Sequence, residues 1–525
     1  MLKQKGRQLS ITDIDVLEQW SNRPLVSENS IYYALAEADD IFSDELFSSA
    51  YSHKGRPATS PAMLTKVLLL QFYENVSDRQ AEERALYDLR WKVALHLPIG
   101  ESGFDHSTLS NFRDRLLQNK KEQEVFQKIL EKAAERKLIP QNSVRQIIDS
   151  TCTLGAGAVQ DTYTLIRKSI YKLIQELQKH INIVEIVKEP LKLNYQDDSK
   201  PKIDWNNPEE RNQLLNDLIS DAEKLLSAIE SHKLSPKGQQ LKEILSKIVE
   251  QDIQRQEDGT VIIKQGVAKD RIISTSDPEM RHGRKSGSRL FDGYKTHTAM
   301  EEESEFITAV EVTPGNQHDS EAATKLIDAQ PKEQQPETIM GDTAYGTGQV
   351  RAAMEDKQIK VIAPAPAEPQ RPGCFPKSAF NIDLESETCQ CPAGKIAEEK
   401  RYSRAGKLKA FAFSEKQCGN CPLKTECTQS KQNRRIVTVH PYEKQLQAAR
   451  AFQKTEEFKE AYSGRYKIER KQSEMVRYGL RKARYIGQAK VKFQAYLIAT
   501  LVNFKRLCKL KMEQIAKEPL PAVIV

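Results

Sequence analysis

The chain has 525 residues, which is enough for several hydrophobic cores, because domains of about 100 to 200 residues are usual. Its 80 Lys and Arg residues face 73 Asp and Glu residues, so any nucleic-acid surface must come from local clustering rather than from overall charge. Residues 1–15 lack the apolar region of a signal peptide, and no stretch approaches the roughly 18 consecutive apolar residues of a membrane span. We therefore expect a soluble, cytoplasmic protein with no membrane partner.

Helices are predicted throughout residues 1–140. Ser60 followed by Pro61 gives a cap and a first-turn proline, and Ser77 to Gln80 has the spacing of a capping box. A third helix is predicted to begin after the polar turn around Asp105 and to carry Arg113. As the recognition helix of a helix-turn-helix it would bind DNA, with Arg113 on a phosphate, which would make residues 1–140 a helical DNA-binding domain. A bundle helix with an ordinary solvated face explains the same pattern equally well.

Short extended segments follow between residues 141 and 365. "SVRQIIDSTCTL" is predicted to be a strand with Asp149 near its end, and residues from about 163 to 265 form a predominantly helical, polar insertion. "GYKTHTAMEEE" and "EFITAVEVTPGNQHDS" predict two strands joined by an acidic turn, and "ETIMGDTAYG" and "QIKVIAPAPA" predict two more. Because helical segments separate the strands, the fold class is predicted to be α/β with a mixed sheet and flanking helices.

Two carboxylates, Asp149 and Asp342, are each expected where a strand ends. In an open α/β sheet ligands collect at the carboxyl ends of strands, so these side chains are candidates for metal binding. The small residues and glycines after Asp342 would let a bulky anionic substrate approach its oxygens. An isolated Asp at such a place is more often a turn or helix cap, but two strand-end carboxylates weaken that alternative.

Glu469 is the third candidate carboxylate. On a helix, Tyr462, Arg465 and Glu469 stand at i, i+3 and i+7 and share one face. Between Tyr462 and Lys492, Lys and Arg greatly outnumber the acids, as expected beside phosphate backbones. Two Asp and one Glu are a ligand set that Mg²⁺ or Mn²⁺ accepts, and a pair of such ions can hold the attacking and leaving oxygens of a phosphoryl transfer.

Cysteines mark the segment 366–439 as an insertion of a different kind. Most of the eight cysteines lie between Cys374 and Cys427, which indicates a reduced thiol cluster rather than a disulfide scaffold. The preferred ligand set for a structural Zn²⁺ ion is Cys391, Cys418, Cys421 and Cys427. A metal-free thiol cluster is an equally good interpretation.

A basic loop is predicted at "RHGRKSGSR", just before a strand. Arg284 and Lys285 in this loop are candidate phosphate contacts, and an ordinary surface loop is the alternative. His297 and His318 are left out of the site, because a lone His is more often part of a hydrogen-bonded structure.

Taken together, these motifs resemble the Asp-Asp-Glu (DDE) transposases of bacterial insertion sequences. The resemblance rests on the strand with Asp149, on "GDTAYGTG" around Asp342 and on the helix with Tyr462, Arg465 and Glu469. "GFDHSTLSNFRDRL" resembles their N-terminal domain, and "GYKTHTAM" resembles their second strand. The segment "CPAGK...CGNCPLKTEC" most resembles the insertion-sequence family eleven-eighty-two. The resemblance covers most of the chain.

The resemblance implies a fold, an activity and a set of partners. Residues 141–365 and 440–510 would form a ribonuclease-H-like catalytic core, followed by a tail at 511–525. The core would cut and join insertion-sequence DNA, with Mg²⁺ held by Asp149, Asp342 and Glu469. The implied partners are the inverted-repeat ends, target DNA and a second copy of the chain in the synaptic complex, at the bacterial nucleoid.

Three further residues would contact DNA in this scheme. Arg465 would hold phosphate, and Tyr462 would pack against DNA or position Arg465. The family has a Lys or Arg seven residues after the Glu, where this chain has Val476 and then Arg477. One residue turns a helix by about 100°, so Arg477 is expected to give a weaker phosphate contact. Two other functions fit the sequence: a ribonuclease-H-like nuclease without transposition, and a non-enzymatic DNA-binding regulator.

Overall fold

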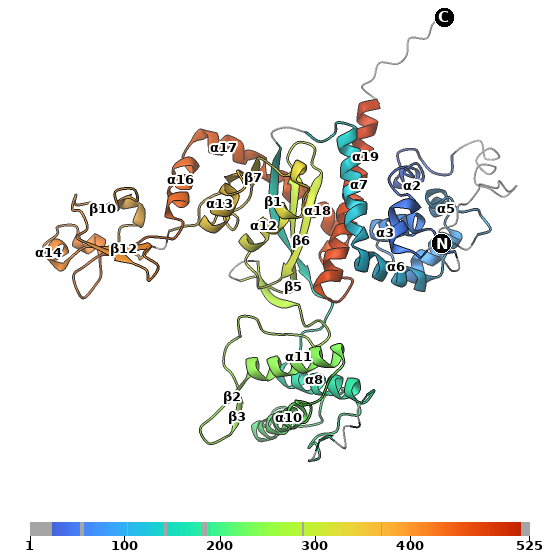
Figure 1. The fold of residues 1–525 in the computed structure, drawn as a ribbon, viewed down its shortest axis with the longest axis horizontal. Coiled ribbons are helices and arrows are strands. Elements are labelled where there is room, and N and C mark those ends of the chain that lie inside the picture. The colour runs from blue at the N-terminus through green and yellow to red at the C-terminus, as the bar shows by residue number, and fades with distance from the viewer. Residues whose placement is uncertain are drawn as a thin grey trace, which may run out of the picture.

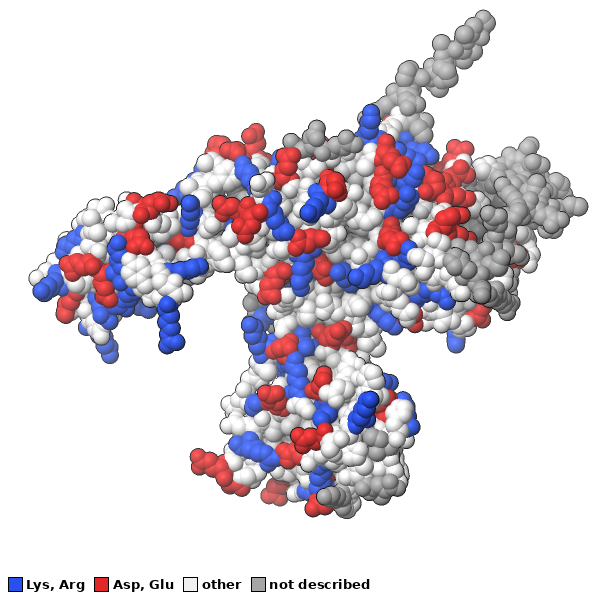
Figure 2. Space-filling model, viewed as in Figure 1, with Lys and Arg blue, Asp and Glu red and all other residues white. Residues whose placement is uncertain are grey.

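A mixed β-sheet lies at the centre of the protein (Figure 1). The computed structural model describes residues 24–515, apart from 53–56, 102, 141–143, 181, 183–185, 188, 286–287 and 369. The N-terminal helices flank the sheet on one side, the cysteine-bearing segment extends from the opposite side, and a helical unit hangs below it. On the face drawn in Figure 2, acidic and basic side chains are interspersed, as the nearly balanced charge leads one to expect.

The N-terminal helices begin where their capping residues predict. Ser60 accepts a hydrogen bond from the Met63 N–H, Ser77 and Gln80 form both bonds of a capping box, and Asp105 accepts from the Ser107 N–H. The three predicted helix starts are therefore confirmed. The elements are α2 (Ile31–Ala36), η1 (Asp44–Ala50), α3 (Pro61–Glu74), α4 (Asp78–Tyr87), α5 (Leu89–Leu95), α6 (His106–Asn119) and α7 (Lys121–Glu135).

The central sheet is mixed, which confirms the predicted α/β class. Its strands are β1 (Arg145–Leu154), β4 (Arg281–Arg284), β5 (Leu290–Glu301), β6 (Ile307–Pro314), β7 (Thr338–Met340) and β8 (Lys360–Ile362). β5 pairs antiparallel with β1, β4 and β6, whereas β7 pairs parallel with both β1 and β8. Strands distant in sequence thus meet side by side, and β1 lies between β5 and β7.

Helices cover both faces of this sheet. Ile148 of β1 packs with residues of α12 (Ser320–Asp328) and α13 (Gly348–Glu355) on one face. Its neighbour Ile147 packs with Ile468 of α18 (Tyr466–Met475) and Phe458 of α17 (Glu456–Tyr462) on the other face. Successive side chains of a strand point to opposite faces, so Asp149 shares the face of Ile147 and of α18.

The C-terminal helix α19 (Gln488–Ile515) joins the N-terminal helices to the sheet. Apolar residues of α19 share one hydrophobic core with α3, α6 and α7 and with residues of β5 and β6. Between α18 and α19 the chain passes through a π-helical segment, η5 (Val476–Leu480), where Gly479 has a φ of 99°. No helix in the described part of the chain combines the length and the apolar content needed to cross a membrane.

The predicted helical insertion forms a unit with its own core. Leu173, Leu218 and Leu245 come from different helices and are fully buried against one another. Its elements are α8 (Thr162–Leu177), α10 (Pro208–Ala228), α11 (Pro236–Asp252), β2 (Ile253–Arg255) and β3 (Val261–Ile263).

The cysteine-bearing segment contains short strands that the sequence did not reveal. Its compact part is built around Phe411, Phe413 and Cys389, all nearly fully buried. Its elements are η3 (Lys377–Ala379), β9 (Asn381–Asp383), β10 (Thr388–Gln390), β11 (Glu399–Tyr402), β12 (Leu408–Ala412), α14 (Glu415–Cys418), α15 (Lys424–Cys427) and β13 (Ile436–Thr438). The chain returns to the sheet through α16 (Glu443–Gln453), and the remaining short turns are η2 (Lys332–Gln334) and η4 (Ser463–Arg465).

Two details of the sequence interpretation need correction. Asp149 lies in the middle of β1 rather than near its end, because antiparallel pairing with β5 continues β1 as far as Leu154. The basic segment predicted as a loop begins with strand β4, in which Arg281 is buried and pairs with Asp270. Arg284 is the last residue of that strand.

Glu122 in the first turn of α7 gives a test of this packing. The residue is 5% exposed, its Oε2 atom has no hydrogen-bond partner among the described residues, and burial raises its pKa to about 7. Because the folded-state pKa is raised, the folded protein keeps a proton that the unfolded chain has already lost, and this carboxyl lowers stability as pH rises toward 7. We expect Glu122→Gln to remove that loss and to stabilise the protein by about 1–3 kcal/mol at pH 8, with little effect near pH 4.

Melting temperatures measured across this pH range would check the prediction. Glu131→Gln, which removes an exposed carboxylate from the same helix, is the matched control and should leave the pH dependence unchanged. Parallel curves for wild type and Glu122→Gln would contradict a buried, protonated Glu122.

Candidate active site

Asp149 is a buried carboxylate on the α18 face of the sheet. It is 8% exposed, its Oδ1 accepts a hydrogen bond from the Ser150 N–H at 2.8 Å, and its Oδ2 accepts from Arg465 Nη2 at 3.2 Å. Burial raises its pKa to about 6, and the carboxylates of Asp342 and Glu469 push it in the same direction. The Arg465 guanidinium and the Ser150 N–H oppose that rise. Water alone therefore does not stabilise the negative charge of the Asp149 carboxylate, which depends on Arg465 and the Ser150 N–H.

Asp342 lies just beyond the end of β7, in the turn that leads to α13. Its Oδ1 accepts a hydrogen bond from the Ala344 N–H at 2.9 Å, and its carbonyl oxygen accepts from the Tyr345 N–H at 3.1 Å. These hydrogen bonds within the turn restrain the orientation of the Asp342 carboxylate, which is half-buried. β7 pairs with β1 only as far as Met340 and Ile147, so the turn with Asp342 begins beside the part of β1 that carries Asp149.

The glycines around Asp342 serve close packing of this turn. A Cβ atom on Gly346 would lie 1.9 Å from the carbonyl oxygen of Pro364, and one on Gly348 would lie 2.5 Å from Cβ of Tyr442. A Cβ on Gly341 would meet Cβ of Tyr345 at 2.9 Å. The small residues at these positions therefore let the turn pack on the protein itself, which gives them a different reason from the substrate access that the sequence suggested.

Glu469 projects from α18 on the side of the two aspartates. Its side chain is 60% exposed, and its Oε1 lies 2.7 Å from Arg465 Nη1. The ring of Tyr462 stacks on Phe458 with centroids 5.3 Å apart. The helical run passes through the 3-10 turn η4 between α17 and α18, and it still presents Tyr462, Arg465 and Glu469 to the site.

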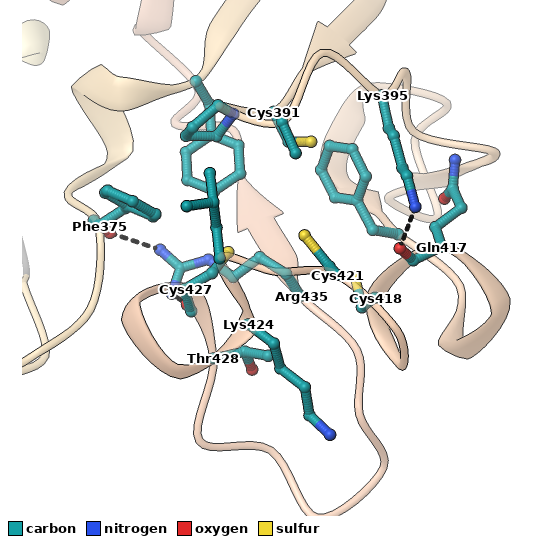
Figure 3. A pocket seen from close by; sticks show the side chains of 15 residues that line it. Phe375, Cys391, Lys395, Gln417, Cys418, Cys421, Lys424, Cys427, Thr428 and Arg435 are labelled. Carbon is teal, nitrogen blue, oxygen red and sulfur yellow. Dashed lines mark hydrogen bonds between the residues drawn. The ribbon is translucent and has the colours of Figure 1, made fainter.

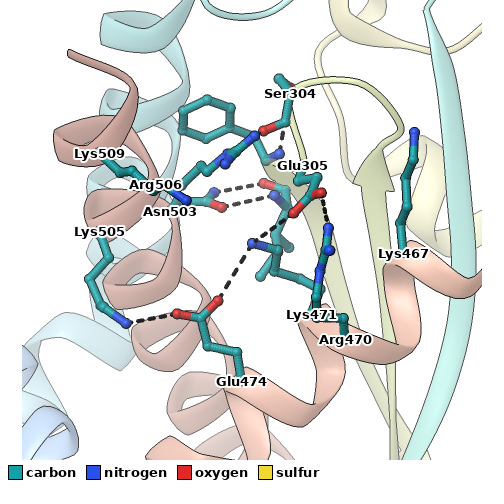
Figure 4. Close-up of polar contacts among 12 residues, drawn as sticks. Ser304, Glu305, Lys467, Arg470, Lys471, Glu474, Asn503, Lys505, Arg506 and Lys509 are labelled. Carbon is teal, nitrogen blue, oxygen red and sulfur yellow. Dashed lines mark hydrogen bonds and ion pairs between the residues drawn. The ribbon is translucent and has the colours of Figure 1, made fainter. Parts of the chain in front are cut away.

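Ion pairs fix α18 against the strands and against α19 (Figure 4). Arg470 and Lys471 pair with Glu305 in the β5–β6 turn, and Lys471 and Lys505 pair with Glu474. Asn503 of α19 exchanges two hydrogen bonds with the backbone of Ile307, at 2.8 and 2.7 Å. These contacts hold the helix that carries Glu469 in a defined position over the sheet.

Arg465 connects the carboxylates. It contacts Asp149 and Glu469 at the same time, and these two acids raise its pKa against the lowering effect of its own burial. Tyr462 also lies in the field of all three carboxylates, although burial is the main reason why its pKa is raised. Arg465 thus joins Asp149 and Glu469 from distant parts of the chain, and Asp342 lies close enough to Asp149 to act on it electrostatically.

The donor set fits a divalent cation. Mg²⁺ and Mn²⁺ prefer carboxylate oxygens, and a cation among these three acids would relieve their mutual repulsion, a task that the Arg465 guanidinium fulfils in part. In the described part of the chain, one group of three side chains already has its ligand atoms within 4.8 Å of one another, namely Glu82, Asp105 and His106. There Asp105 caps α6 and Glu82 accepts hydrogen bonds from His106, which accounts for that group without a metal.

Two models of protein families match the chain. Residues 390–508 match the family described as "Transposase DDE domain", and residues 21–115 match "Transposase domain (DUF772)". These matches indicate a DDE transposase. The first match includes β11 to β13, α18 with Glu469 and most of α19, and the second includes the N-terminal helices as far as α6. No curated protein and no solved structure matches the transposase.

Three of the six predicted DNA contacts lie on exposed surface. Arg284 and Lys285 are exposed where β4 leads into the hairpin with β5, and Lys285 N–H donates to the Arg289 carbonyl. Arg477 is exposed on η5, on the wall of a groove formed by α2, α18 and α19. Arg465 and Tyr462 lie at the carboxylates themselves.

Arg113 is engaged inside the protein instead. Its guanidinium makes two hydrogen bonds to the carboxylate of Asp78 at 2.9 and 2.6 Å, and its side chain is 12% exposed. The same guanidinium lies over the Tyr485 ring, 5.3 Å from the centroid. Arg113 therefore ties α6 to the start of α4, as in an ordinary bundle helix, and the structure gives no support to its predicted phosphate contact.

The four predicted zinc ligands line one small cavity (Figure 3). Cys391, Cys418, Cys421 and Cys427 surround a space of about 20 Å³ next to the core of the cysteine-bearing segment. Burial raises the pKa of Cys418, and it raises that of Cys427 to about 11. The other three thiols all act on Cys427 electrostatically, although no three of the four sulfur atoms lie within 4.8 Å of one another.

Arg351 holds the turn that carries Asp342, although no motif in the sequence indicates this role. Its Nε donates to the Gly346 carbonyl at 3.0 Å, and its Nη2 donates to the Ala363 carbonyl at 2.5 Å. Since its partners in these bonds are backbone carbonyls, no acidic residue in the sequence marks its role. The residue is buried, and burial lowers its pKa to about 10.

Gly346→Ala tests whether this packing positions Asp342. The added methyl group would overlap the Pro364 carbonyl oxygen, so we expect a loss of about 1–3 kcal/mol in stability, as in overpacked cores. DNA cleavage should fall together with the melting temperature. Gly100→Ala, where nothing lies within 4 Å of the new atom, is the control and should change neither property. Wild-type behaviour of Gly346→Ala would show that the turn adapts freely.

Proposed function

We propose that this transposase cuts the ends of an insertion sequence and joins them to target DNA by metal-dependent phosphoryl transfer. The observation that carries the proposal is that Asp149 and Glu469 both contact Arg465, with Asp342 close enough to Asp149 to raise its pKa, beside a helix rich in Lys and Arg. Three carboxylates would hold Mg²⁺ or Mn²⁺ and leave coordination positions open for water and phosphate.

The proposed catalytic core is ribonuclease-H-like. The antiparallel run of β6, β5 and β1, continued by the parallel strands β7 and β8, supports this assignment. Helices on both faces support it as well. The core would comprise residues 141–365 and 440–510, interrupted by the helical insertion and the cysteine-bearing segment, with residues up to 140 as a DNA-binding domain.

In the proposed reaction, bound Mg²⁺ would activate the attacking oxygen and stabilise charge on the leaving oxygen of an in-line displacement. Water attacks the phosphodiester at the transposon end first and frees a 3′-hydroxyl, which then attacks a phosphodiester of the target. Arg465 would exchange its contact with Glu469 for a phosphate oxygen, to which a guanidinium can donate two parallel hydrogen bonds. Tyr462, stacked on Phe458, would keep Arg465 in place.

Exposed cations away from the carboxylates would hold the DNA backbone. Arg284, Lys285 and Arg477 are the proposed contacts, because each is exposed and a phosphate contact needs a free positive group. Two DNA ends must be held together during transposition, so we also propose a homodimer acting at the bacterial nucleoid.

Neutralising the carboxylates one at a time tests the proposal. We expect Asp149→Asn, Asp342→Asn and Glu469→Gln each to lower cleavage by at least about 100-fold, because metal ligands stabilise several kcal/mol of transition-state charge. The substrate is a supercoiled donor plasmid that carries the terminal inverted repeats, and DNA binding is measured in parallel. Glu460→Gln, an exposed acid on the neighbouring helix α17, is the control for loss of one negative charge.

The outcomes separate the proposed function from its alternatives. Binding without cleavage in the three variants, with cleavage and joining in wild type and Glu460→Gln, supports it. Cleavage by wild type without joining to new DNA would indicate a nuclease. If every activity of the protein persisted in all three variants, the protein would be a DNA-binding regulator and the catalytic assignment would be wrong.

We also propose that the cysteine cavity binds a structural Zn²⁺ ion. Four thiols from α14, α15 and the adjacent loops line one cavity, and a tetrahedral Zn²⁺ site needs four such ligands. The raised pKa values of Cys418 and Cys427 mean that ion binding would have to displace protons from these thiols. An ion there would cross-link the loops around the small core of this segment.

Metal analysis of the purified protein checks this assignment. We expect about one Zn²⁺ per chain, lost in Cys421→Ser together with a lower melting temperature of the cysteine-bearing segment. Cys508→Ser, at a cysteine of α19 outside the cavity, should keep the metal. If the wild-type protein contained no metal and a chelator did not change its stability, the four cysteines would be a cluster of reduced thiols without zinc.

A further inference from the structure

The hairpin of β11 and β12 carries a concentration of positive charge that has no role in the proposed reaction. Residues 400–409 contain five Lys and Arg residues and no Asp or Glu. The whole cysteine-bearing segment, residues 366–439, has 13 Lys and Arg residues against 8 Asp and Glu, whereas the two kinds are nearly balanced over the chain. Basic side chains project from the lower edge of this segment in Figure 2. The segment therefore has the local clustering of charge that a nucleic-acid surface requires.

Three cations at the tip of this hairpin have no acidic partner. Arg404, Lys407 and Lys409 are exposed, and no ion pair or side-chain hydrogen bond in the described part of the chain involves their side chains. Lys400 and Arg401, nearer the base of the hairpin, each pair with an acid, at 3.5 and 3.0 Å. The three tip cations can therefore bind an anion without breaking any contact that holds the protein together.

A β-bulge places Lys409 on the outside of the hairpin. The ladder with β11 passes directly from Ala410 to Leu408, so Lys409 has no partner across it. Residues three apart in a regular strand face opposite ways, but the extra residue lets Leu408 and Phe411 both pack on the core of the segment. The hairpin is thus anchored by its apolar side chains while Lys409 is left exposed.

Hydrogen bonds within the tip give it a defined shape. The Ser403 N–H donates to the Lys407 carbonyl at 2.8 Å, and the Gly406 N–H donates to the Ser403 carbonyl at 3.0 Å. Gly406 has a φ of 71°, which favours glycine. The ladder between β12 and β13 runs only from Ala410 to Ala412, so the tip projects beyond the third strand as a two-stranded ribbon. A ribbon of this kind is narrow enough to enter the major groove of DNA.

We propose that the β11–β12 hairpin is a DNA-binding arm, in which Arg404, Lys407 and Lys409 hold phosphates of duplex DNA away from the cleaved bond. This role deepens the proposed function and rests on it, because DNA is the partner there. The cysteine-bearing segment extends from the sheet on the side opposite the N-terminal helices (Figure 1), so the arm gives the protein a separate hold on DNA. Contacts to phosphates position the duplex without reading its sequence.

A variant that combines Arg404→Ala, Lys407→Ala and Lys409→Ala tests the arm. Each phosphate contact adds about 0.9 to the slope of log affinity against log salt concentration, so we expect this slope to fall by about 2–3. Fluorescence anisotropy with the full-length protein would measure it, on a duplex with the terminal inverted repeat and on a random duplex of equal length. Both duplexes should lose affinity by the same factor. A loss confined to one sequence would indicate base recognition and contradict the phosphate contacts.

A second triple variant controls for net charge. Lys202, Lys233 and Lys269 lie on and beside the helical insertion, are exposed, and form no ion pair in the described part of the chain. Their combined change to Ala removes the same charge and should leave the salt slope as in wild type. Neither triple variant should change the melting temperature. Equal losses of DNA affinity in the two variants would show a general charge effect and overturn the arm.

Cleavage and joining distinguish which DNA the arm holds. If it holds the transposon end, the hairpin variant needs more protein for half-maximal cleavage but reaches the wild-type rate at saturation, because the carboxylates are intact. If it holds target DNA, cleavage is unchanged and joining to the target falls. Wild-type cleavage and joining at every protein concentration would overturn the arm.

Failure of the arm and failure of the proposed function have different signatures. If wild type binds neither duplex, the proposed function fails. If wild type binds and cleaves DNA while the hairpin variant keeps its affinity and salt slope, only the arm fails. Unchanged DNA binding together with an altered oligomeric state would make the hairpin a contact between two copies of the chain, and would also overturn the arm.

Discussion

The parallel pairing of β1 with β7 is the constraint on which the candidate active site depends. It consists of only three residue pairs, from Arg145 with Thr338 to Ile147 with Met340. This short ladder sets Asp149 beside the turn with Asp342, and Ile147 on the same face receives Ile468 of the helix that carries Glu469. A slip of one residue would turn Asp149 to the opposite face, toward α12 and α13, and would separate it from Arg465. The buried residues Ile147 and Ile148, on opposite faces, oppose such a slip.

Much of the fold could be predicted because local chemistry determines it. Ser60, Ser77 and Asp105 begin helices through hydrogen bonds to residues two or three positions away, and such signals are complete within a few letters of sequence. The length of β1 and the existence of β4 could not be predicted in the same way. Both result from pairing with β5, which lies more than a hundred positions beyond β1 but directly after β4, and the residue types alone do not give the register of either pairing. The short strands around Phe411 also exist through pairing, with partners 6 to 28 positions away in the chain.

In the candidate site, too, features of local origin could be predicted and features that depend on distant contacts could not. Tyr462, Arg465 and Glu469 could be placed together because one helical face joins them, and the structure adds the ion pair between Arg465 and Asp149 that no periodicity reveals. Arg113 was predicted to contact phosphate but pairs with Asp78 instead. A solvated arginine and one paired inside the protein look alike in sequence. The packing role of the glycines near Asp342 could not be predicted, since the atoms that exclude a Cβ belong to Pro364 and Tyr442, outside the local motif. Arg351, bound to carbonyls alone, has no sequence signature at all.

The helical insertion between β1 and β5 also bears on how the chain acquires its shape during synthesis. Domains emerge from the ribosome in order, and long-range strand pairing is slow because a large loop must close first. β1 leaves the ribosome with neither of its neighbours yet made, whereas α8, α10 and α11 can collapse at once around Leu173, Leu218 and Leu245. By condensing this stretch, the insertion brings the end of β1 and the start of β5 within reach of each other. A segment without chemistry of its own would then act as an internal assembly aid for the catalytic sheet.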